Sequence, residues 1–182
     1  MKATLAGRGW LGQGIRTAAA LGAALLLVTV ATPAVRADSA RSAPAAPEGF
    51  TARVIALTNA ERAAVGVPPV AGDPQLTVAA QRYAEVMAET SCFGHACGPV
   101  PTLGDRAAAA GDARWRFLGE NVAAGQPTPE RVVAAWMASP THRAVLLNPE
   151  FTRLGVGRTV GGQYGTYWTQ EFGHPAAGAR QR

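Results

Sequence analysis

Cysteine is scarce in this sequence: only Cys92 and Cys97 occur among its 182 residues. Neither lies near the end of the N-terminal apolar segment, so no thiol is placed there for a lipoprotein anchor. The sequence also lacks a serine in the Gly-x-Ser-x-Gly context of a nucleophile turn, and it has no His-x-x-x-His pair. No basic cluster with interleaved aromatic residues is present, which argues against a nucleic-acid partner.

The first 37 residues have the pattern of a secretory signal peptide. Lys2, Arg8 and Arg16 precede an apolar run over residues 18–31, and Val35-Arg36-Ala37 offers small residues to a signal peptidase. We therefore predict a signal peptide over residues 1–37, a secreted mature protein, and no stable membrane anchor after cleavage. The alternative is an uncleaved anchor, for which the apolar run is short, since a bilayer span needs about 20 residues.

Removal of this segment changes the charge argument. The whole chain has a formal net charge of +5, but the mature chain would keep 13 basic residues against 12 acidic ones. A nearly neutral chain gives no electrostatic reason to expect nucleic acid or an anionic membrane as a partner. About 145 residues remain, enough for one domain that buries roughly 70% of its unfolded surface.

The mature chain begins with a spacer and continues with helical patterns. Residues 38–49 are rich in Ala, Pro and Ser, which favours a flexible linker. From Phe50 to about Val65 apolar residues recur on one side, with Arg53 and Arg62 off it. Further helices are predicted from Asp73-Pro74 to about residue 90, where Asp73 is an N-cap, and over residues 102–110.

The C-terminal third changes from helical to alternating periodicity. Thr152, Leu154 and Val156 alternate before Gly161-Gly162, and Tyr164, Thr166, Trp168, Gln170 and Phe172 alternate after it. This pattern predicts an antiparallel hairpin. Residues 115–122 are predicted to form a short extended segment. The last residues, 175–182, are expected to be a disordered tail, and His174 beside them is interpreted as incidental.

The loop that holds both cysteines allows three interpretations. In an exported protein a Cys92–Cys97 disulfide is favoured, and closing so small a loop would stabilise the fold by only about 2 kcal/mol. The second interpretation is a zinc site made by Cys92, His95 and Cys97, which lacks an obvious fourth ligand. Two free thiols are the third.

A stretch from Val132 to Asn148 contains a histidine at a helix junction. Val132, Val133, Trp136 and Met137 recur at helical spacing, with Thr128 as the N-cap and Glu130 in the first turn. Ser139-Pro140 is predicted to end this helix and begin another, with Ser139 accepting a bond from a backbone N–H. His142 then falls in the first turn, where the helix dipole disfavours imidazolium. We expect a neutral ring; a helix-terminal histidine bonded to backbone is the alternative.

Several motifs, in order, resemble the CAP superfamily (cysteine-rich secretory, antigen 5 and pathogenesis-related proteins), in its bacterial secreted branch. The resemblance covers about residues 50–173. The motifs that carry it are Leu57-Thr58-Asn59-Ala60-Glu61-Arg62, Phe93-Gly94-His95, Gly119-Glu120-Asn121-Val122-Ala123, Trp136-Met137-Ala138-Ser139-Pro140-Thr141-His142-Arg143, Leu154-Gly155-Val156-Gly157 and Tyr167-Trp168-Thr169-Gln170. It implies an α+β fold, a three-layer α-β-α sandwich with an antiparallel central sheet, over residues 50–174.

The resemblance also implies a cleft that can hold a divalent metal such as zinc. His95, Glu120 and His142 match three of the four positions that commonly line it, whereas the second glutamate, expected near Ser139, is missing. Taken alone, Glu120 would be interpreted as an exposed or salt-bridged glutamate; the resemblance reverses that interpretation. The residues expected to line the cleft beside these three are Ser139, Asn121 and Gln170.

Two functions are compatible with these residues. The first is a secreted, monomeric binding module without catalytic residues, which frames a small apolar ligand (a lipid or sterol-like molecule) or contacts a cell-envelope component. The alternative is a metal-dependent extracellular hydrolase, a peptidase or nuclease, in which His95, Glu120 and His142 hold the metal. The missing second acid argues against the alternative.

Overall fold

The computed structural model describes residues 49–98, 102–111 and 114–178. These residues belong to one compact unit, Ser42–Arg182. The predicted signal peptide, and the predicted linker up to residue 48, lie outside the described residues.

The first helix, α1 (Gly49–Ala64), buries a different stripe from the one predicted. Its buried residues are Val54, Thr58 and Arg62, four residues apart, whereas Ala60 and Ala64 are exposed. The prediction that Arg62 lies off the buried side is therefore wrong. The guanidinium donates to the carbonyl oxygens of four residues in the loops nearby: Pro68, Leu146, Asn148 and Phe151. Buried carbonyls need donors, so this arginine is drawn into the core.

The second helix, α2 (Pro74–Thr90), follows the prediction closely. Asp73 is its N-cap and accepts hydrogen bonds from the N–H groups of Gln75 and Leu76. Its apolar side faces the core, where Leu76, Ala79, Ala80, Tyr83 and Met87 are buried. Just before it lies β1 (Ala71–Gly72), a two-residue strand too short to show a period in the sequence.

The next two elements are α3 (Leu103–Ala110) and β2 (Trp115–Ala124). Thr102 caps α3 by accepting from the N–H of Asp105, and the helix ends before Gly111 as predicted. The short extended segment predicted over residues 115–122 is a full strand of ten residues.

The helix junction lies between α4 (Pro129–Ala138) and α5 (Pro140–Leu146). Thr128 caps α4, and Val132, Val133 and Trp136 are buried as predicted. The prediction that Ser139 caps α5 with its side chain is wrong. Its hydroxyl lies 3.2 Å from the hydroxyl of Thr141, so the first turn of α5 has no side-chain cap.

The predicted hairpin is formed by β3 (Arg153–Val160) and β4 (Thr166–Pro175). Gly161 N–H donates to the carbonyl of Gly165 across the turn, and Tyr164 lies in this turn rather than on the return strand. β4 continues to Pro175, and the N–H of Ala176 donates to the carbonyl of Arg114. Residues 175 and 176, which were expected to belong to the tail, thus pair with the chain at the start of β2.

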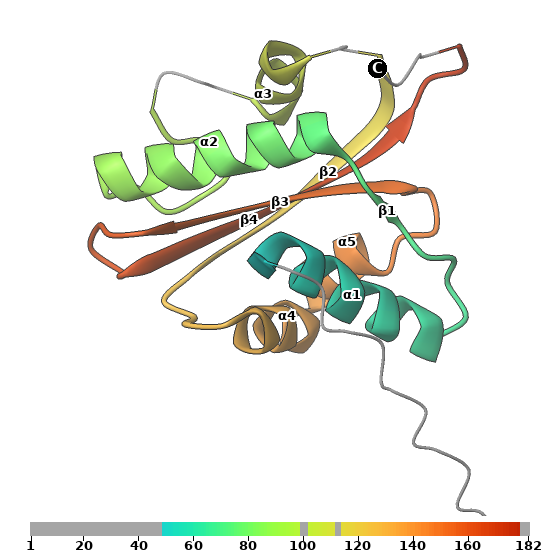
Figure 1. Ribbon diagram of the computed structural model, residues 1–182, viewed down its shortest axis with the longest axis horizontal. Helices are drawn as coiled ribbons and strands as arrows, with labels where there is room; N and C mark the ends of the chain where they lie inside the picture. Colours follow the sequence, from blue (N-terminus) through green and yellow to red (C-terminus); the bar gives the residue numbers. More distant parts are fainter. Residues whose placement is uncertain (1–48, 99–101, 112–113, 179–182) are drawn as a thin grey trace, which may run out of the picture. The chain divides into compact units, whose positions relative to one another are not determined.

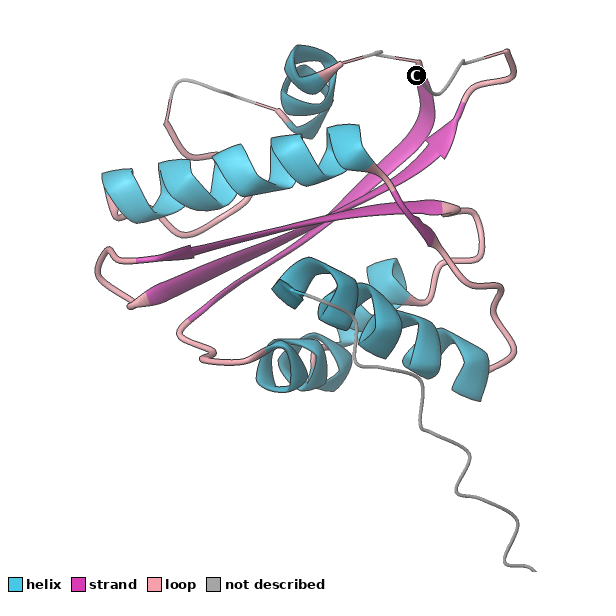
Figure 2. Ribbon diagram, viewed as in Figure 1, coloured by secondary structure: helices cyan, strands magenta, loops and turns pink. Residues whose placement is uncertain are grey.

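Helices cover both faces of a four-stranded sheet in the order β1-β3-β4-β2 (Figures 1 and 2). On one face lie α2 and α3, and on the other lie α1, α4 and α5 (Figure 1). The three-layer α-β-α sandwich is therefore confirmed. The sheet is mixed rather than antiparallel throughout, because β1 pairs with β3 in parallel while the other two pairings are antiparallel.

Two glycines of β3 let α2 lie directly on the strand. A Cβ atom on Gly155 would come within 2.0 Å of the backbone of Leu76, and one on Gly157 within 2.3 Å of the backbone of Ala80. Such distances cannot be relieved by moving a side chain. The Leu-Gly-Val-Gly motif thus fixes how closely α2 packs on the sheet.

Among the described residues no helix has the length and apolar character needed to cross a membrane.

Candidate functional site

A buried carboxylate, Glu120 on β2, is the centre of the predicted site. Its side chain is only 4% exposed, and both of its oxygens are engaged. Nδ1 of His95 lies 2.8 Å from Oε1, and Nη2 of Arg106 donates to Oε2. The structure therefore brings Glu120 and His95 together, as expected, and adds an arginine that was not predicted to be there.

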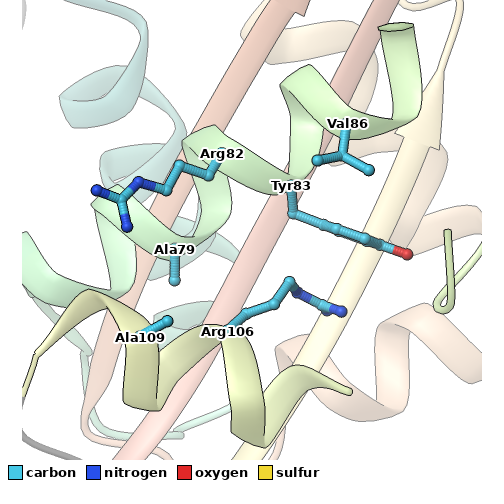
Figure 3. A pocket seen from close by; sticks show the side chains of 6 residues that line it. All are labelled: Ala79, Arg82, Tyr83, Val86, Arg106 and Ala109. Carbon is cyan, nitrogen blue, oxygen red and sulfur yellow. The ribbon is translucent and has the colours of Figure 1, made fainter. Parts of the chain in front are cut away.

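Arg106 projects from α3 and bridges two carboxylates. Besides Glu120, it reaches Glu171 on β4, whose Oε1 lies 3.3 Å from Nε. The guanidinium carbon is 3.6 Å from the centre of the Tyr83 ring, a cation–π contact. Figure 3 shows Arg106 and Tyr83 extending side by side from α3 and α2. The arginine thus bonds to two acidic side chains in a buried place.

Glu171 is the second acid of this region, and it lies on β4 rather than near Ser139. It is the cross-strand partner of Glu120 and is completely buried. Burial, reinforced by the charge of Glu120 and opposed by Arg106, raises the pKa of Glu171 to about 8. At neutral pH Glu171 therefore carries its proton, and the charge of Arg106 is balanced by Glu120 alone.

The alternating pattern of the last strand gives only a weak signal for this pair. Glu171 falls on the phase that the alternating set does not include, like Tyr167 and Thr169. Because β4 is a central strand covered by helices on both faces, that phase is buried too. Arg106 is likewise only 4% exposed, although an arginine in a short Ala-rich helix has the character of a surface residue.

His95 lies on the loop closed by the Cys92–Cys97 disulfide, which is confirmed. This bond also rules out the zinc site proposed for Cys92, His95 and Cys97, because both sulfurs are bonded to each other. The hydroxyl of Tyr83 donates to the carbonyl of Gly94 and ties the loop to α2. The His95 side chain is 61% exposed, so Nε2, the nitrogen not used by Glu120, is accessible to a ligand.

His142 lies in the first turn of α5, on the other side of the sheet's β2 edge. Burial lowers its pKa, and the charge of His95 lowers it further. The prediction of a neutral ring is thus supported, but the first cause is burial rather than the helix dipole. The backbone carbonyl of His142 accepts a bond from Asn121 Nδ2 at 3.1 Å.

Three further residues were expected to line the site, and two of them are completely buried. Asn121 and Gln170 are completely buried and bonded to each other at 3.2 Å. Gln170 in turn donates to Thr58 Oγ1 on α1 at 2.8 Å. These residues form a polar chain on the face of the sheet that α1 and α5 cover, and the chain connects α1, β4 and β2 with the backbone of His142 in α5. Ser139 is partly exposed at the α4–α5 junction.

The donor set fits a resident metal poorly. Among the described residues no group of three or more His, Cys, Asp or Glu side chains is arranged to hold an ion. Glu120 has both oxygens in use, one of them on a guanidinium, so it acts as a partner of His95 rather than as a ligand. That leaves two imidazoles, one fewer protein ligand than catalytic zinc sites use.

Comparison with known proteins gives consistent matches. The profile of the cysteine-rich secretory protein family (CAP) matches residues 55–172. The uncharacterized protein YkwD of Bacillus subtilis is 38% identical over 142 residues, which are 76% of this chain and 52% of that protein. The uncharacterized membrane protein YlbC of the same organism is 31% identical over 66% of this chain and 33% of its own length. The chain thus spans about half or less of these relatives.

Solved structures show the same architecture. An extracellular protein containing an SCP domain from Bacillus anthracis superposes with a TM-score of 0.62 at 32% identity, over 69% of this chain and 40% of that one. An outer surface protein of Borrelia burgdorferi superposes with a TM-score of 0.62 at 23% identity, over 68% of this chain and 90% of that one, a likeness of fold alone. With the profile spanning most of the domain described above, this chain belongs to the cysteine-rich secretory protein (CAP) family.

Proposed function

We propose that this protein is exported and acts outside the cell as a binding module rather than as a metalloenzyme. Its binding residues are His95, His142 and Glu120, which we call the imidazole site. The observation that carries the proposal is the double engagement of Glu120 by His95 and Arg106: an ion at this carboxylate would lie beside the positive charge of the guanidinium.

The chemistry of the imidazole site suits recognition of a polar ligand. Nδ1 of His95 lies in hydrogen-bond contact with Glu120, which orients the ring and leaves Nε2 as the nitrogen that faces a ligand. His142 stays neutral at physiological pH because its pKa is lowered. No activated serine or thiol accompanies these rings among the described residues: the Ser139 hydroxyl has Thr141 as its hydrogen-bond partner, and the two cysteines are bonded to each other.

Zinc titration separates this proposal from the metal-dependent hydrolase, the alternative. We expect calorimetry of the mature protein to show no zinc site with a Kd below roughly 1 µM at pH 7. His142→Ala should give the same weak heat as wild type, and so should His174→Ala, a histidine away from the site. Stoichiometric binding that only His142→Ala abolishes would establish the metal site and overturn the proposal.

Export is supported by the N-terminal pattern and by the similarity to the extracellular protein of Bacillus anthracis. N-terminal sequencing of protein recovered from the culture medium tests it. We expect the mature chain to begin at Asp38. Recovery of the chain only in the membrane fraction, with residues 1–37 intact, would favour the uncleaved anchor.

A lipid or sterol-like ligand is the second candidate, and one observation favours it. An apolar cavity of about 120 Å³ lies between α2 and α3 (Figure 3). Its lining residues are Ala79, Arg82, Tyr83, Val86, Arg106 and Ala109. Typical small-molecule sites measure roughly 300–1,000 Å³, so this cavity suits a short acyl group better than a sterol. Titration with short-chain fatty acids and cholesterol tests it; uptake of neither would remove this candidate.

A further inference from the structure

The outer edge of β2 exposes backbone groups beside the imidazole site. β2 is the last strand of the sheet and pairs only with β4. The N–H of Gly125 donates to the carbonyl of Thr166 on β4. Because antiparallel pairing alternates, the odd-numbered residues of β2 from Phe117 on bond to β4, and the N–H and C=O of Leu118 and Glu120 point outward. Within the described ranges no hydrogen bond reaches these four groups.

This open stretch of edge has defined ends. Beyond it the outward carbonyl of Val122 accepts a bond from Trp136 Nε1, so α4 closes the edge there. Before it the register shifts between Trp115 and Phe117, a bulge of the kind that terminates regular pairing. Between these ends lies Glu120, which is 9% exposed as a whole residue, whereas its side chain is 4% exposed. The accessible part of this residue is therefore chiefly its backbone.

The edge continues directly into the imidazole site. His95 approaches Glu120 from the α2 face of the sheet, and His142 is tied to Asn121, the next residue, from the α5 face. A strand added along Leu118–Glu120 would therefore run toward the space between the two rings. Exposed Arg116 and Phe117 lie at the other end, with the Arg116 guanidinium 5.1 Å from the Phe117 ring centre.

We propose that the β2 edge at Leu118–Glu120 receives an extended segment of a partner protein as an additional strand, which delivers that segment to the imidazole site. The unpaired N–H and C=O groups supply main-chain recognition. Apolar side chains of the segment would lie beside Leu118 and Phe117, and an acidic one within reach of Arg116, which forms no ion pair with another described residue. This inference rests on the proposed function, since it names the class of partner.

Amide hydrogen exchange tests the edge residue by residue. In the free protein the amides of Leu118 and Glu120 should exchange fast, whereas those of Gly119 and Asn121, bonded to β4, should be protected. The probe is a blocked octapeptide, Thr-Val-Glu-Val-Thr-Val-Glu-Thr, added to the full mature chain. We expect it to protect the Leu118 and Glu120 amides. The same peptide with alternate residues N-methylated on the pairing side should bind roughly tenfold more weakly, as two hydrogen bonds are lost.

A matched pair of variants separates backbone from side-chain recognition. Leu118→Pro removes the outward donor without touching the β4 ladder, since proline is tolerated at such edge positions. It should weaken peptide binding roughly two- to tenfold, since one hydrogen bond is lost, whereas Leu118→Ala should bind with nearly the affinity of wild type. If Leu118→Pro does not fold, the N-methylated peptide still distinguishes backbone recognition from side-chain recognition. Peptide binding without protection of Leu118 and Glu120, equal affinity of both variants, or no binding at millimolar peptide would overturn the inference.

Three further outcomes are distinguishable. If the peptide shifts the ring signals of His95 and His142 but leaves the edge amides unprotected, the imidazole site binds and the edge inference fails. If the amides are protected and the ring signals do not move, the edge binds a segment and the proposed role of the imidazole site fails. Protection that increases with protein concentration, without peptide, would identify a second copy of the chain as the occupant and overturn the inference.

Discussion

Replacing Glu171 with glutamine should change how the stability of this protein depends on pH. The pKa of Glu171 is about 8 in the folded protein, against 4.5 for an unperturbed glutamate. Between these values the folded state holds a proton that the unfolded state has released. Folding therefore takes up a proton, and the free energy of unfolding falls as pH rises, with the full contribution present below pH 4.5.

The size of the effect follows from the pKa difference. Each pH unit between 4.5 and 8 should lower the free energy of unfolding by about 1.4 kcal/mol, so the whole range amounts to roughly 5 kcal/mol. That is comparable with the total stability of many domains. Glu171→Gln keeps the volume and an acceptor for Arg106 Nε, but it has no proton to lose. Its stability should lack this slope.

Urea denaturation at intervals from pH 4.5 to 8.5 measures the effect. The quantity to compare is the difference between wild type and Glu171→Gln, because other groups that titrate contribute equally to both. Glu89→Gln, an exposed position on α2, is the control and should follow wild type. Parallel curves for wild type and Glu171→Gln would refute the interpretation of Glu171 as a buried neutral acid.

Three other predictions concern the core, the loop and the imidazoles. Arg62→Met should lower the free energy of unfolding by roughly 3–5 kcal/mol in urea denaturation, because four buried carbonyls lose their donor; Arg62→Lys should cost less. Replacing Cys92 and Cys97 with alanine should cost about 2 kcal/mol by the same assay and should broaden the NMR signals of the His95 ring, since the loop is no longer closed. His95→Gln should raise the pKa of His142, measured by NMR titration, because a neighbouring positive charge is removed.

Each of these has an outcome that contradicts it. Equal stability of Arg62→Met and wild type would mean that water satisfies the carbonyls. Sharp, unshifted His95 signals in the cysteine variant would mean that the Tyr83–Gly94 bond alone holds the loop. An unchanged His142 titration in His95→Gln would place the two rings too far apart to interact; His174→Gln is the control for a remote histidine.

Local signals in the sequence were sufficient to predict most of the helices and strands. Asp73-Pro74 and Thr128-Pro129 each combine a capping side chain with a proline at the first helical position, and both helices begin there. The alternating residues around Gly161-Gly162 predicted the final hairpin, and the two closely spaced cysteines of an exported chain predicted their disulfide. These features depend on residues a few positions apart, which is why they could be predicted without knowing the rest of the fold.

Buried charge was the part that local periodicity could not predict. Arg62 is buried because four carbonyls from segments up to 89 residues away converge on it. Arg106, Glu120 and Glu171 stabilise one another from three different elements. Alone, each of these residues has the character of a solvent-exposed charge. Only the tertiary arrangement supplies the partners that make its burial tolerable.

The place of the imidazole site follows from the order of the strands. His95 belongs to the layer above the sheet and His142 to the layer below, and in the interior of the sheet a strand would separate them. At β2, the outermost strand, the two layers can meet around an edge. β2 takes this outermost position because it pairs with β4, although α4, α5 and β3 lie between these two strands in the sequence. The same order pairs Glu120 with Glu171 and leaves the outward backbone of Leu118 and Glu120 open, so that the acid pair, the imidazoles and the exposed edge have one structural origin.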